Sequence, residues 1–146
     1  MGFKKECEVL KLMKDLGYFT IGYCFNVKQA SMIAQSGVDI VACHAGGTTG
    51  GLVGFKSDYD MDGTIKLMQS FIDAAKKART ECDFLTIIHG GIMETPETIA
   101  PVLAATEAVG YLGASSLKRT PVEPVIIKVC QDFKKMPINI PKWMKL

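Results

Sequence analysis

Two patterns of apolar residues alternate along this chain. Short segments are almost continuously apolar and contain many β-branched or aromatic residues, which predicts strands buried on both faces. Between them, apolar residues recur every three or four positions, which predicts amphipathic helices with one face against a core. The predicted strands cover residues 18–25, 38–44, 83–89 and the apolar run that begins at Val109.

Polar residues that favour helix N-termini stand before the helical segments. Side chains of Ser, Thr, Asp and Asn accept hydrogen bonds from the free N–H groups of a first turn, and proline fits the first helical position. The starts predicted in this way are Asn26 for a helix over 27–35, Asp60 or Asp62 for a helix that reaches Arg79, and Thr95 with Pro96. Another helix, over 6–16, precedes the first strand, and its apolar stripe consists of Val9, Leu10, Met13 and Leu16.

The last helical segment has two candidate beginnings. Thr120-Pro-Val-Glu123 matches a capping box with proline at the first helical position, whereas Pro124 can move the start to Glu123. Glu123 is therefore interpreted as a capping rather than a catalytic carboxylate. The residues predicted to face the core are Val122, Ile126, Val129, Cys130 and Phe133.

One helix followed by four strand–helix units predicts the fold class. Strands joined by helical crossovers pair in parallel, so we expect an α/β fold with a parallel (βα)4 unit preceded by one helix. With 146 residues, the chain suits a single domain that buries its own core. We assign residues 1–136 to that domain and the proline-broken residues 137–146 to a C-terminal tail.

Charge and composition narrow the function class. The net charge is only +2 and the basic residues do not gather into a stripe, so no nucleic-acid partner is predicted. No apolar run is long enough to cross a bilayer, so no membrane partner is predicted either. The five cysteines are an odd number without a C-x-x-C pair, which favours free thiols over disulfides or a zinc site. We therefore expect a cytoplasmic protein.

All four predicted strands end in polar or glycine-rich residues. The carboxyl ends of parallel strands meet at one edge of the sheet, and ligands of such folds bind there. These ends carry Asn26, His44 with Ala-Gly-Gly-Thr-Thr, His89 with Gly-Gly, and Gly113 with Ala-Ser-Ser. The agreement among four segments predicts a small-molecule site on this rim.

His44 and His89 are the candidate catalytic residues. Each can be a histidine at the edge of the core that bonds to backbone, or a member of an acid–base pair near a carbonyl or phosphate group. Cys43 points to the opposite face of the strand from His44, so no Cys–His dyad is expected. Two histidines without a carboxylate at ligand spacing give no metal assignment, although a divalent cofactor such as Mg²⁺ stays an open alternative.

Small residues near the rim are the candidate anion-binding groups. Glycine and alanine let a ligand approach backbone N–H groups, serine and threonine add hydroxyl donors, and arginine adds a planar fork. Each also has a structural alternative, which is a tight turn or cap for the small residues and a helix-surface position for the arginine. The candidates are Thr48, Thr49, Gly90, Gly91, Gly113, Ala114, Ser115, Ser116 and Arg119.

Three of these segments together resemble a known family. They are His44-Ala-Gly-Gly-Thr-Thr-Gly-Gly51, His89-Gly-Gly with Thr95-Pro-Glu97, and Gly113-Ala-Ser-Ser-Leu-Lys-Arg-Thr-Pro-Val-Glu123. In order and spacing they are similar to the phosphoenolpyruvate hydrolase-like TIM-barrel family, whose barrel also forms the C-terminal domain of plant antiviral resistance-type proteins. Ile92 and Lys118 replace the family's proline and acidic residue, and an anion site needs neither of these.

The resemblance implies half of a TIM barrel. A whole barrel needs about 250 residues, and the likeness covers its C-terminal half, without the ATP-binding domain found in the plant proteins. Half a barrel leaves sheet edges and one sheet face open. We therefore expect a homo-oligomer that closes a barrel, association with a separate N-terminal half-barrel, or a fragmentary gene product.

Residues and resemblance together predict a site for a small anionic metabolite. We expect it to bind a phosphorylated or carboxylated compound of the phosphoenolpyruvate type and to hydrolyse it or cleave a carbon–carbon bond. In this interpretation the two histidines serve as acid and base, and the loops with Arg119 hold the anion. The alternative is a non-catalytic metabolite-binding or signal-transduction module, or an inactive partial barrel.

Overall fold

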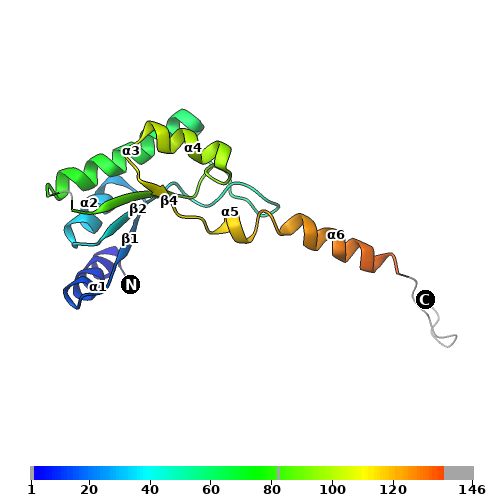
Figure 1. Ribbon diagram of the computed structural model, residues 1–146, viewed down its shortest axis with the longest axis horizontal. Helices are drawn as coiled ribbons and strands as arrows, with labels where there is room; N and C mark the ends of the chain where they lie inside the picture. Colours follow the sequence, from blue (N-terminus) through cyan, green and yellow to red (C-terminus); the bar gives the residue numbers. More distant parts are fainter. Residues whose placement is uncertain (1, 82, 137–146) are drawn as a thin grey trace.

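The sheet has four parallel strands in the order of the sequence. The computed structural model describes residues 2–81 and 83–136. β1 (Ile21–Cys24), β2 (Ile40–His44), β3 (Leu85–His89) and β4 (Gly110–Tyr111) pair in the order β1-β2-β3-β4 (Figure 1). Strands that are neighbours both in the chain and in a parallel sheet are the arrangement of (βα)8 barrels, of which four units are half. The predicted α/β fold with a parallel (βα)4 half-barrel is confirmed.

Three helices cover one face of this sheet. α2 (Val27–Gln35), α3 (Met61–Ala78) and α4 (Pro96–Ala105) each connect one strand to the next (Figure 1). Burial of an aliphatic or aromatic side chain in such a layer contributes about 1.5–3 kcal/mol. The core contains Cys24, Val41, Cys43 and Ile88 from the strands, and Ala30, Ile33, Ala34, Met68, Phe71, Ile72, Ala75 and Val102 from the helices.

The other face of the sheet is left open by these helices. Side chains alternate along a strand, so Tyr23, Ala42 and Ile87, which stand side by side in the register, point away from the helix-covered core. At the amino ends of β1 and β3 on this face, Ile21 is 39% exposed and Leu85 is 51% exposed. In a complete barrel this face is the packed interior.

The predicted helix starts are confirmed where a polar side chain caps the first turn. Asn26 Oδ1 accepts a hydrogen bond from the Gln29 N–H at 2.9 Å, at the start of α2. Asp60 Oδ1 accepts one from the Gly63 N–H at 2.8 Å, at the start of α3. Both contacts satisfy N–H groups that have no partner within the helix.

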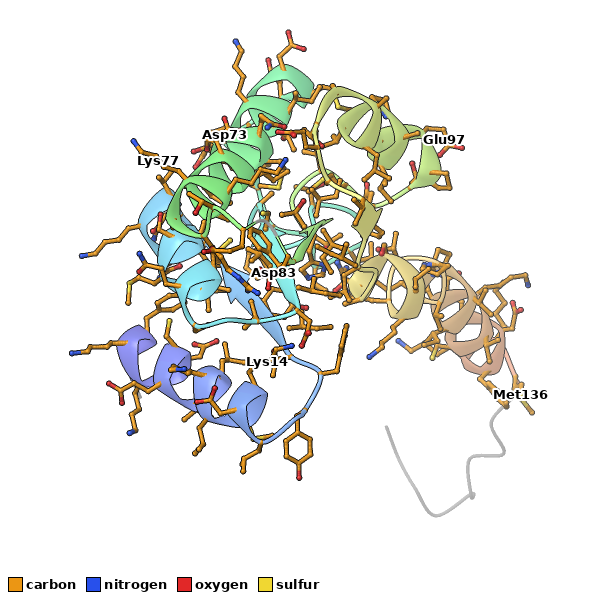
Figure 2. The ribbon with its side chains drawn as sticks, turned by 60° about the vertical axis from the view of Figure 1, so that its left-hand side comes forward. Lys14, Asp73, Lys77, Asp83, Glu97 and Met136 are labelled. Atoms are coloured by element: carbon orange, nitrogen blue, oxygen red, sulfur yellow. The ribbon has the colours of Figure 1, made fainter. Side chains whose placement is uncertain are left out.

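An ionic cluster joins α1 (Phe3–Asp15) to the amino end of the sheet. Lys14 forms an ion pair with Asp39, whose carboxylate also accepts a hydrogen bond from the Thr20 N–H at 2.8 Å. These contacts lower the pKa of Asp39 to about 2, with the Lys14 bond the largest cause and the Thr20 N–H the next. Thr20 and Asp39 precede β1 and β2, and Figure 2 shows Lys14 on α1 and Asp83 before β3. These positions are at the amino ends of the strands, so the cluster lies at the end of the sheet opposite the predicted rim.

The apolar stripe predicted for α1 is wrong in part. Phe3, Cys7 and Leu10 pack against the core, whereas Val9 and Leu16 are exposed. The helix begins three residues before the predicted start, and this adds Phe3 to one face. The spacing 3, 7 and 10 then defines the stripe that turns toward the core.

The core face predicted for the last helix is wrong. A single turn, α5 (Ser115–Lys118), leads to α6 (Glu123–Lys134), which extends away from the layered body in Figure 1. No residue of α6 is buried, and Met136 at its end lies far from α1–α4 in Figure 2. The helix after a strand packs between that strand and the next one, and no fifth strand follows β4 in residues 2–136. The residues affected are Val122, Ile126, Val129, Cys130 and Phe133.

Among the described residues, no helix combines the length and apolar character that crossing a membrane requires. The predicted tail, 137–146, lies outside the described residues.

Candidate active site

His44 and His89 lie side by side where β2 and β3 end. They are partners in the strand register, so both point to the open face of the sheet. Their ring centroids are 4.6 Å apart, and the ring planes make an angle of 81°. His44 is half-buried, and His89 is 8% exposed. The structure therefore brings the two predicted catalytic residues into direct contact on one rim.

Two aromatic rings from β1 and the residue after it border the imidazoles. The Tyr23 ring centroid is 5.7 Å from that of His44 and 5.6 Å from that of His89. The Phe25 ring lies 4.8 Å from His44, also between centroids. These rings replace water around His44 and supply a flat apolar wall beside the polar rim.

Each imidazole is held through its Nδ1 atom by the backbone. His44 Nδ1 accepts a hydrogen bond from the Gly46 N–H at 2.9 Å. His89 Nδ1 lies 2.6 Å from the carbonyl oxygen of Leu112, to which it donates. The backbone-bound interpretation of both histidines is thus correct for Nδ1, while the described residues offer no hydrogen bond to either Nε2.

His44 is neutral at physiological pH. Burial lowers the pKa of His44 to about 4, and the neighbouring His89 is the second cause because a charge on one ring opposes a charge on the other. A neutral imidazole can still donate and accept one hydrogen bond each.

The loops that follow β2 and β3 are joined by backbone hydrogen bonds. The Ala45 N–H donates to His89 O at 2.9 Å, the Gly91 N–H to Gly46 O at 2.8 Å, and the Thr49 N–H to Gly91 O at 3.0 Å. Gly91 thus uses its N–H within the fold, so its predicted contact with an anion would come through close approach rather than through that donor. These bonds join the two loops into one rim.

Gly90 must be a glycine in this rim. Its φ is +78°, a region that other residues rarely adopt. A Cβ atom at this position would lie 2.2 Å from Gly46 O and 3.1 Å from His44 Cε1. The absent side chain therefore allows the β3 loop to approach both the β2 loop and the His44 ring.

The Gly113–Ser116 segment starts directly beside His89, because Leu112 accepts the hydrogen bond from that ring. Tyr111 donates its hydroxyl to Met93 O at 2.8 Å, so the 2.9 Å contact with Ser116 Oγ is donated by the serine. The Ser116 hydroxyl is therefore already used in a hydrogen bond within the fold. Ala114 and Ser115 are half-buried, and no hydrogen bond of their N–H groups or of the Ser115 hydroxyl occurs within the described residues.

Arg119 reaches the rim but is already paired. Its guanidinium donates to Glu123 Oε1 at 2.9 Å and to Gly50 O at 2.8 Å. Glu123 also accepts from the Leu52 N–H at 2.7 Å, and this bond and then Arg119 lower the pKa of Glu123. The loop after β2 is therefore fastened to the start of α6.

These contacts correct the interpretation of Glu123 as a cap. α6 begins at Glu123, as Pro124 allowed, and no side chain caps its first turn. Thr120 Oγ1 is buried without a hydrogen-bond partner, so the capping box does not form. The carboxylate of Glu123 is used by Arg119 and Leu52 instead.

A family model described as phosphoenolpyruvate hydrolase-like matches residues 1–136, which include the whole rim. The chain belongs to the phosphoenolpyruvate hydrolase-like family. It is 34% identical over 137 residues to the ToMV susceptible protein tm-1(GCR26) of Solanum lycopersicum, with 93% of this chain and 18% of that protein covered. It is 29% identical over 136 residues to the putative transcriptional regulatory protein y4pA of Sinorhizobium fredii, with 93% and 22% covered. The chain thus spans about a fifth of the length of these curated relatives.

Two solved structures each match part of this chain. A nitroalkane oxidase from Streptomyces ansochromogenes matches with a TM-score of 0.47 and 24% identity, over 76% of this chain and 31% of that one. FabK from Thermotoga maritima matches with a TM-score of 0.47 and 20% identity, over 72% and 29%.

Three residues of this rim were not predicted from the sequence. Tyr23 and Phe25 could have been found, because Tyr23 in β1 and Phe25 directly after that strand continue the alternation that points to the same face as His44. Glu94 could not, since only the fold brings its carboxylate against Gly50, where a Cβ would lie 1.5 Å from Oε2. That Oε2 atom is buried without a hydrogen-bond partner.

Thr48 and Thr49 border the same rim. Thr48 is buried at the loop after β2, and its carbonyl accepts a hydrogen bond from the Phe55 N–H at 3.1 Å. Among the described residues, no three His, Cys, Asp or Glu side chains gather closely enough to hold a metal ion. Polar groups of the rim without a hydrogen-bond partner in the described residues include the two imidazole Nε2 atoms, the backbone N–H groups of Ala114 and Ser115, and the Thr49 and Ser115 hydroxyls.

Proposed function

We propose that this phosphoenolpyruvate hydrolase-like protein binds a small phosphorylated or carboxylated metabolite at the carboxyl ends of β2, β3 and β4. The observation that supports this best is the contact between His44 and His89 directly beside the Gly113–Ser116 segment. Two adjacent imidazoles next to unpaired backbone N–H groups suit an anionic compound that also carries a reactive carbonyl, enol or ester group. The proposed reactions are hydrolysis and carbon–carbon cleavage, with His44 and His89 as acid and base.

Anion binding would use groups that the fold leaves unpaired. Ala114 and Ser115 can donate backbone N–H groups, and Thr49 and Ser115 can donate hydroxyls. Arg119 can take part only if an anion shares or replaces its bond to Glu123. A divalent ion such as Mg²⁺ brought by the substrate is part of the same proposal.

Calorimetric titration of the whole chain with phosphoenolpyruvate, with and without Mg²⁺, tests the proposal. We expect saturable binding that weakens at least tenfold in His89→Ala and stays unchanged in Lys128→Ala, a matched substitution on the exposed face of α6. Circular dichroism checks that both variants are folded. Absence of binding at millimolar phosphoenolpyruvate contradicts the proposal.

A second candidate function is a binding or signalling module without turnover. The supporting observation is that Arg119, the only rim cation among the predicted residues, is neutralised by Glu123. This function predicts phosphoenolpyruvate binding with no pyruvate released, whereas an enzyme releases pyruvate and phosphate, which a coupled assay detects.

We also propose that a partner covers the open sheet face, either a second copy of this chain or a separate N-terminal half-barrel. The exposed Ile21 and Leu85 on that face and the unpacked apolar face of α6 support this. Light scattering at micromolar concentration tests the first option, since a dimer has twice the 15.9 kDa of one chain. A stable, well-packed monomer counts against the proposal that a partner is needed to cover this face.

The compartment proposed for this protein is the reducing cytoplasm. The described cysteines, Cys7, Cys24, Cys43 and Cys130, are free thiols. Free thiols persist in a reducing environment.

A further inference from the structure

The two rim imidazoles are held by backbone groups of opposite kind. A backbone N–H can only donate, so the Nδ1 atom of His44 that receives the Gly46 bond carries no hydrogen. A carbonyl oxygen can only accept, so the Nδ1 atom of His89 that bonds Leu112 must carry one. In neutral rings the second nitrogen has the opposite state, which leaves Nε2–H on His44 and a lone pair on His89 Nε2.

We infer that the fold locks these histidines in complementary tautomers, with His44 as the hydrogen-bond donor and His89 as the base for a substrate with an enolisable carbonyl. The inference rests on the proposed function for its substrate, since it names the class of anion that the rim would take: a 2-oxo acid or its enol. The Nδ1 states of the two rings follow from their backbone bonds alone.

Neither reacting nitrogen is used by the fold. Neither Nε2 atom has a hydrogen-bond partner among the described residues, and neither is among the buried unpaired atoms, which are Glu94 Oε2 and Thr120 Oγ1. Each Nε2 atom therefore keeps some contact with solvent. The rings that contact the pair are those of Tyr23, Phe25 and Tyr111, and within the described residues neither imidazole forms an ion pair or hydrogen bond with a carboxylate.

The two tautomers give His89 and His44 different roles in one proton transfer. His89 Nε2 takes a proton from the carbon next to the carbonyl, and the electron pair of that C–H bond becomes the C=C bond. The π pair of the C=O bond moves to oxygen, which accepts the hydrogen bond from His44 Nε2–H. The imidazolium of His89 and the enolate then balance in charge, and return of the proton to carbon reverses the step. A neutral imidazole can stabilise an enolate in this way without giving up its own proton.

The closeness of the rings supports the division of roles. Two charges at a centroid distance of 4.6 Å repel, so protonation of His89 disfavours protonation of His44. His44 therefore remains a neutral donor at the moment when His89 holds the substrate proton, and the lowered pKa of His44 agrees with this.

Nitrogen-15 NMR of the two histidine rings tests the tautomers in the whole chain without any ligand. At neutral pH we expect His44 to show a pyridine-type Nδ1 and a pyrrole-type Nε2, and His89 the reverse. Assignment uses His44→Gln and His89→Gln. Two rings with the same tautomer, or an imidazolium at His44, overturn the inference.

Exchange of the methyl hydrogens of pyruvate in D₂O tests the roles, with pyruvate as the smallest enolisable 2-oxo acid. We expect His89→Gln to slow enzyme-dependent exchange by about 100-fold or more, because the glutamine amide supplies no base. His44→Ala should slow it by about 100-fold, and His44→Gln should restore part of the rate because its amide N–H can donate.

The outcomes separate this inference from the proposed function. Pyruvate that binds to rings in the expected tautomers but exchanges at the rate without protein overturns the roles. Lack of pyruvate binding, together with binding of phosphoenolpyruvate, overturns the 2-oxo acid class and leaves the proposed function intact. Lack of binding of both contradicts the proposed function, while the spectra still decide the tautomers.

Discussion

The surroundings of His44 set its charge before any ligand arrives. Burial beside Phe25 and Tyr23 is the main cause of its low pKa, and the neighbouring His89 ring is the second. The first effect depends on the sheet and the aromatic wall, whereas the second depends on one side chain. The two can therefore be separated by substitution.

His89→Gln is expected to raise the pKa of His44 above 4 while leaving it below the 6.5 of a free histidine, because the repulsion disappears and the burial does not. Titration of the His44 ring by NMR measures this. Phe25→Ala, which opens the ring to water, should also raise the pKa. A His44 pKa that does not respond to either change contradicts the assigned causes.

Asp39 is expected to stabilise the fold only above the pH at which it protonates. Its folded pKa of about 2 lies below the unfolded value of 3.8, so its contribution is complete above about pH 5 and is lost as the pH falls toward 2. Asp39→Asn should therefore lower the urea midpoint at pH 7, and the difference should narrow between pH 5 and pH 3. Asp58→Asn, at an exposed position, serves as control. A constant difference across this range would show that the ion pair with Lys14 is not the cause.

Single residues of the site were predictable where the alternation of side chains along a strand determines their direction. His44 and His89 end apolar strands, and the alternation of strand side chains puts Cys43 and His44 on opposite faces, as the structure confirms. The pairing of Arg119 with Gly50 was not predictable. It joins residues 69 positions apart and depends on how the β2 loop folds over the start of α6.

At the scale of elements, the loops after β2 and β3 are the structural basis of the rim. They are joined by hydrogen bonds from Gly91 to Gly46 and from Thr49 to Gly91. This arrangement requires residues without side chains where one backbone passes another. Gly90 is the tightest of these positions beside the imidazoles.

Gly90→Ala is expected to destabilise the fold by more than its backbone conformation alone explains. Gly17 is the control, because its φ of +86° is close to the +78° of Gly90 and no atom lies within 4 Å of an added Cβ. Gly17→Ala should cost roughly 1–2 kcal/mol in unfolding free energy, and Gly90→Ala should cost at least about 1 kcal/mol more because of the contact with Gly46 O. Chemical denaturation measures both, and equal losses would contradict the close approach.

The beginnings of α2 and α3 were predicted well because capping is a local interaction, whereas α1 begins three residues earlier than predicted and the capping box at Thr120 does not form. Asn26 and Asp60 cap α2 and α3 as their positions indicated. The packing faces of α1 and α6 were predicted less well, because a stripe of apolar residues shows that a helix can be buried and not what will bury it. In α6 the stripe is present and the covering strand is absent from the described sheet.

At the scale of the whole molecule, the helix-covered core and the open sheet face differ in what they contribute to stability. Ile33 is fully buried between α2 and the sheet, whereas Ile126 on α6 is 57% exposed. The same substitution at these two positions therefore compares packed and unpacked apolar surface.

Ile33→Ala is expected to lower the unfolding free energy by about 2–5 kcal/mol through the cavity it leaves. Ile126→Ala should change that of the monomer by no more than about 0.5 kcal/mol. Urea denaturation at several protein concentrations measures both. A loss at Ile126 that grows with protein concentration would show that α6 packs against a second copy, and a large loss at every concentration would contradict the extended position of α6.

The buried thiols of Cys24 and Cys43 can report when the helices separate from the sheet. Both thiols are completely buried under the helices and are register partners on β1 and β2, and the bond to Cys24 and burial raise the pKa of Cys43. An alkylating reagent should label the exposed Cys130 at once and reach these two only when the layer of helices separates from the sheet. Peptide mass spectrometry over a labelling time course would then give the opening rate of this core directly, without a dye or an introduced probe.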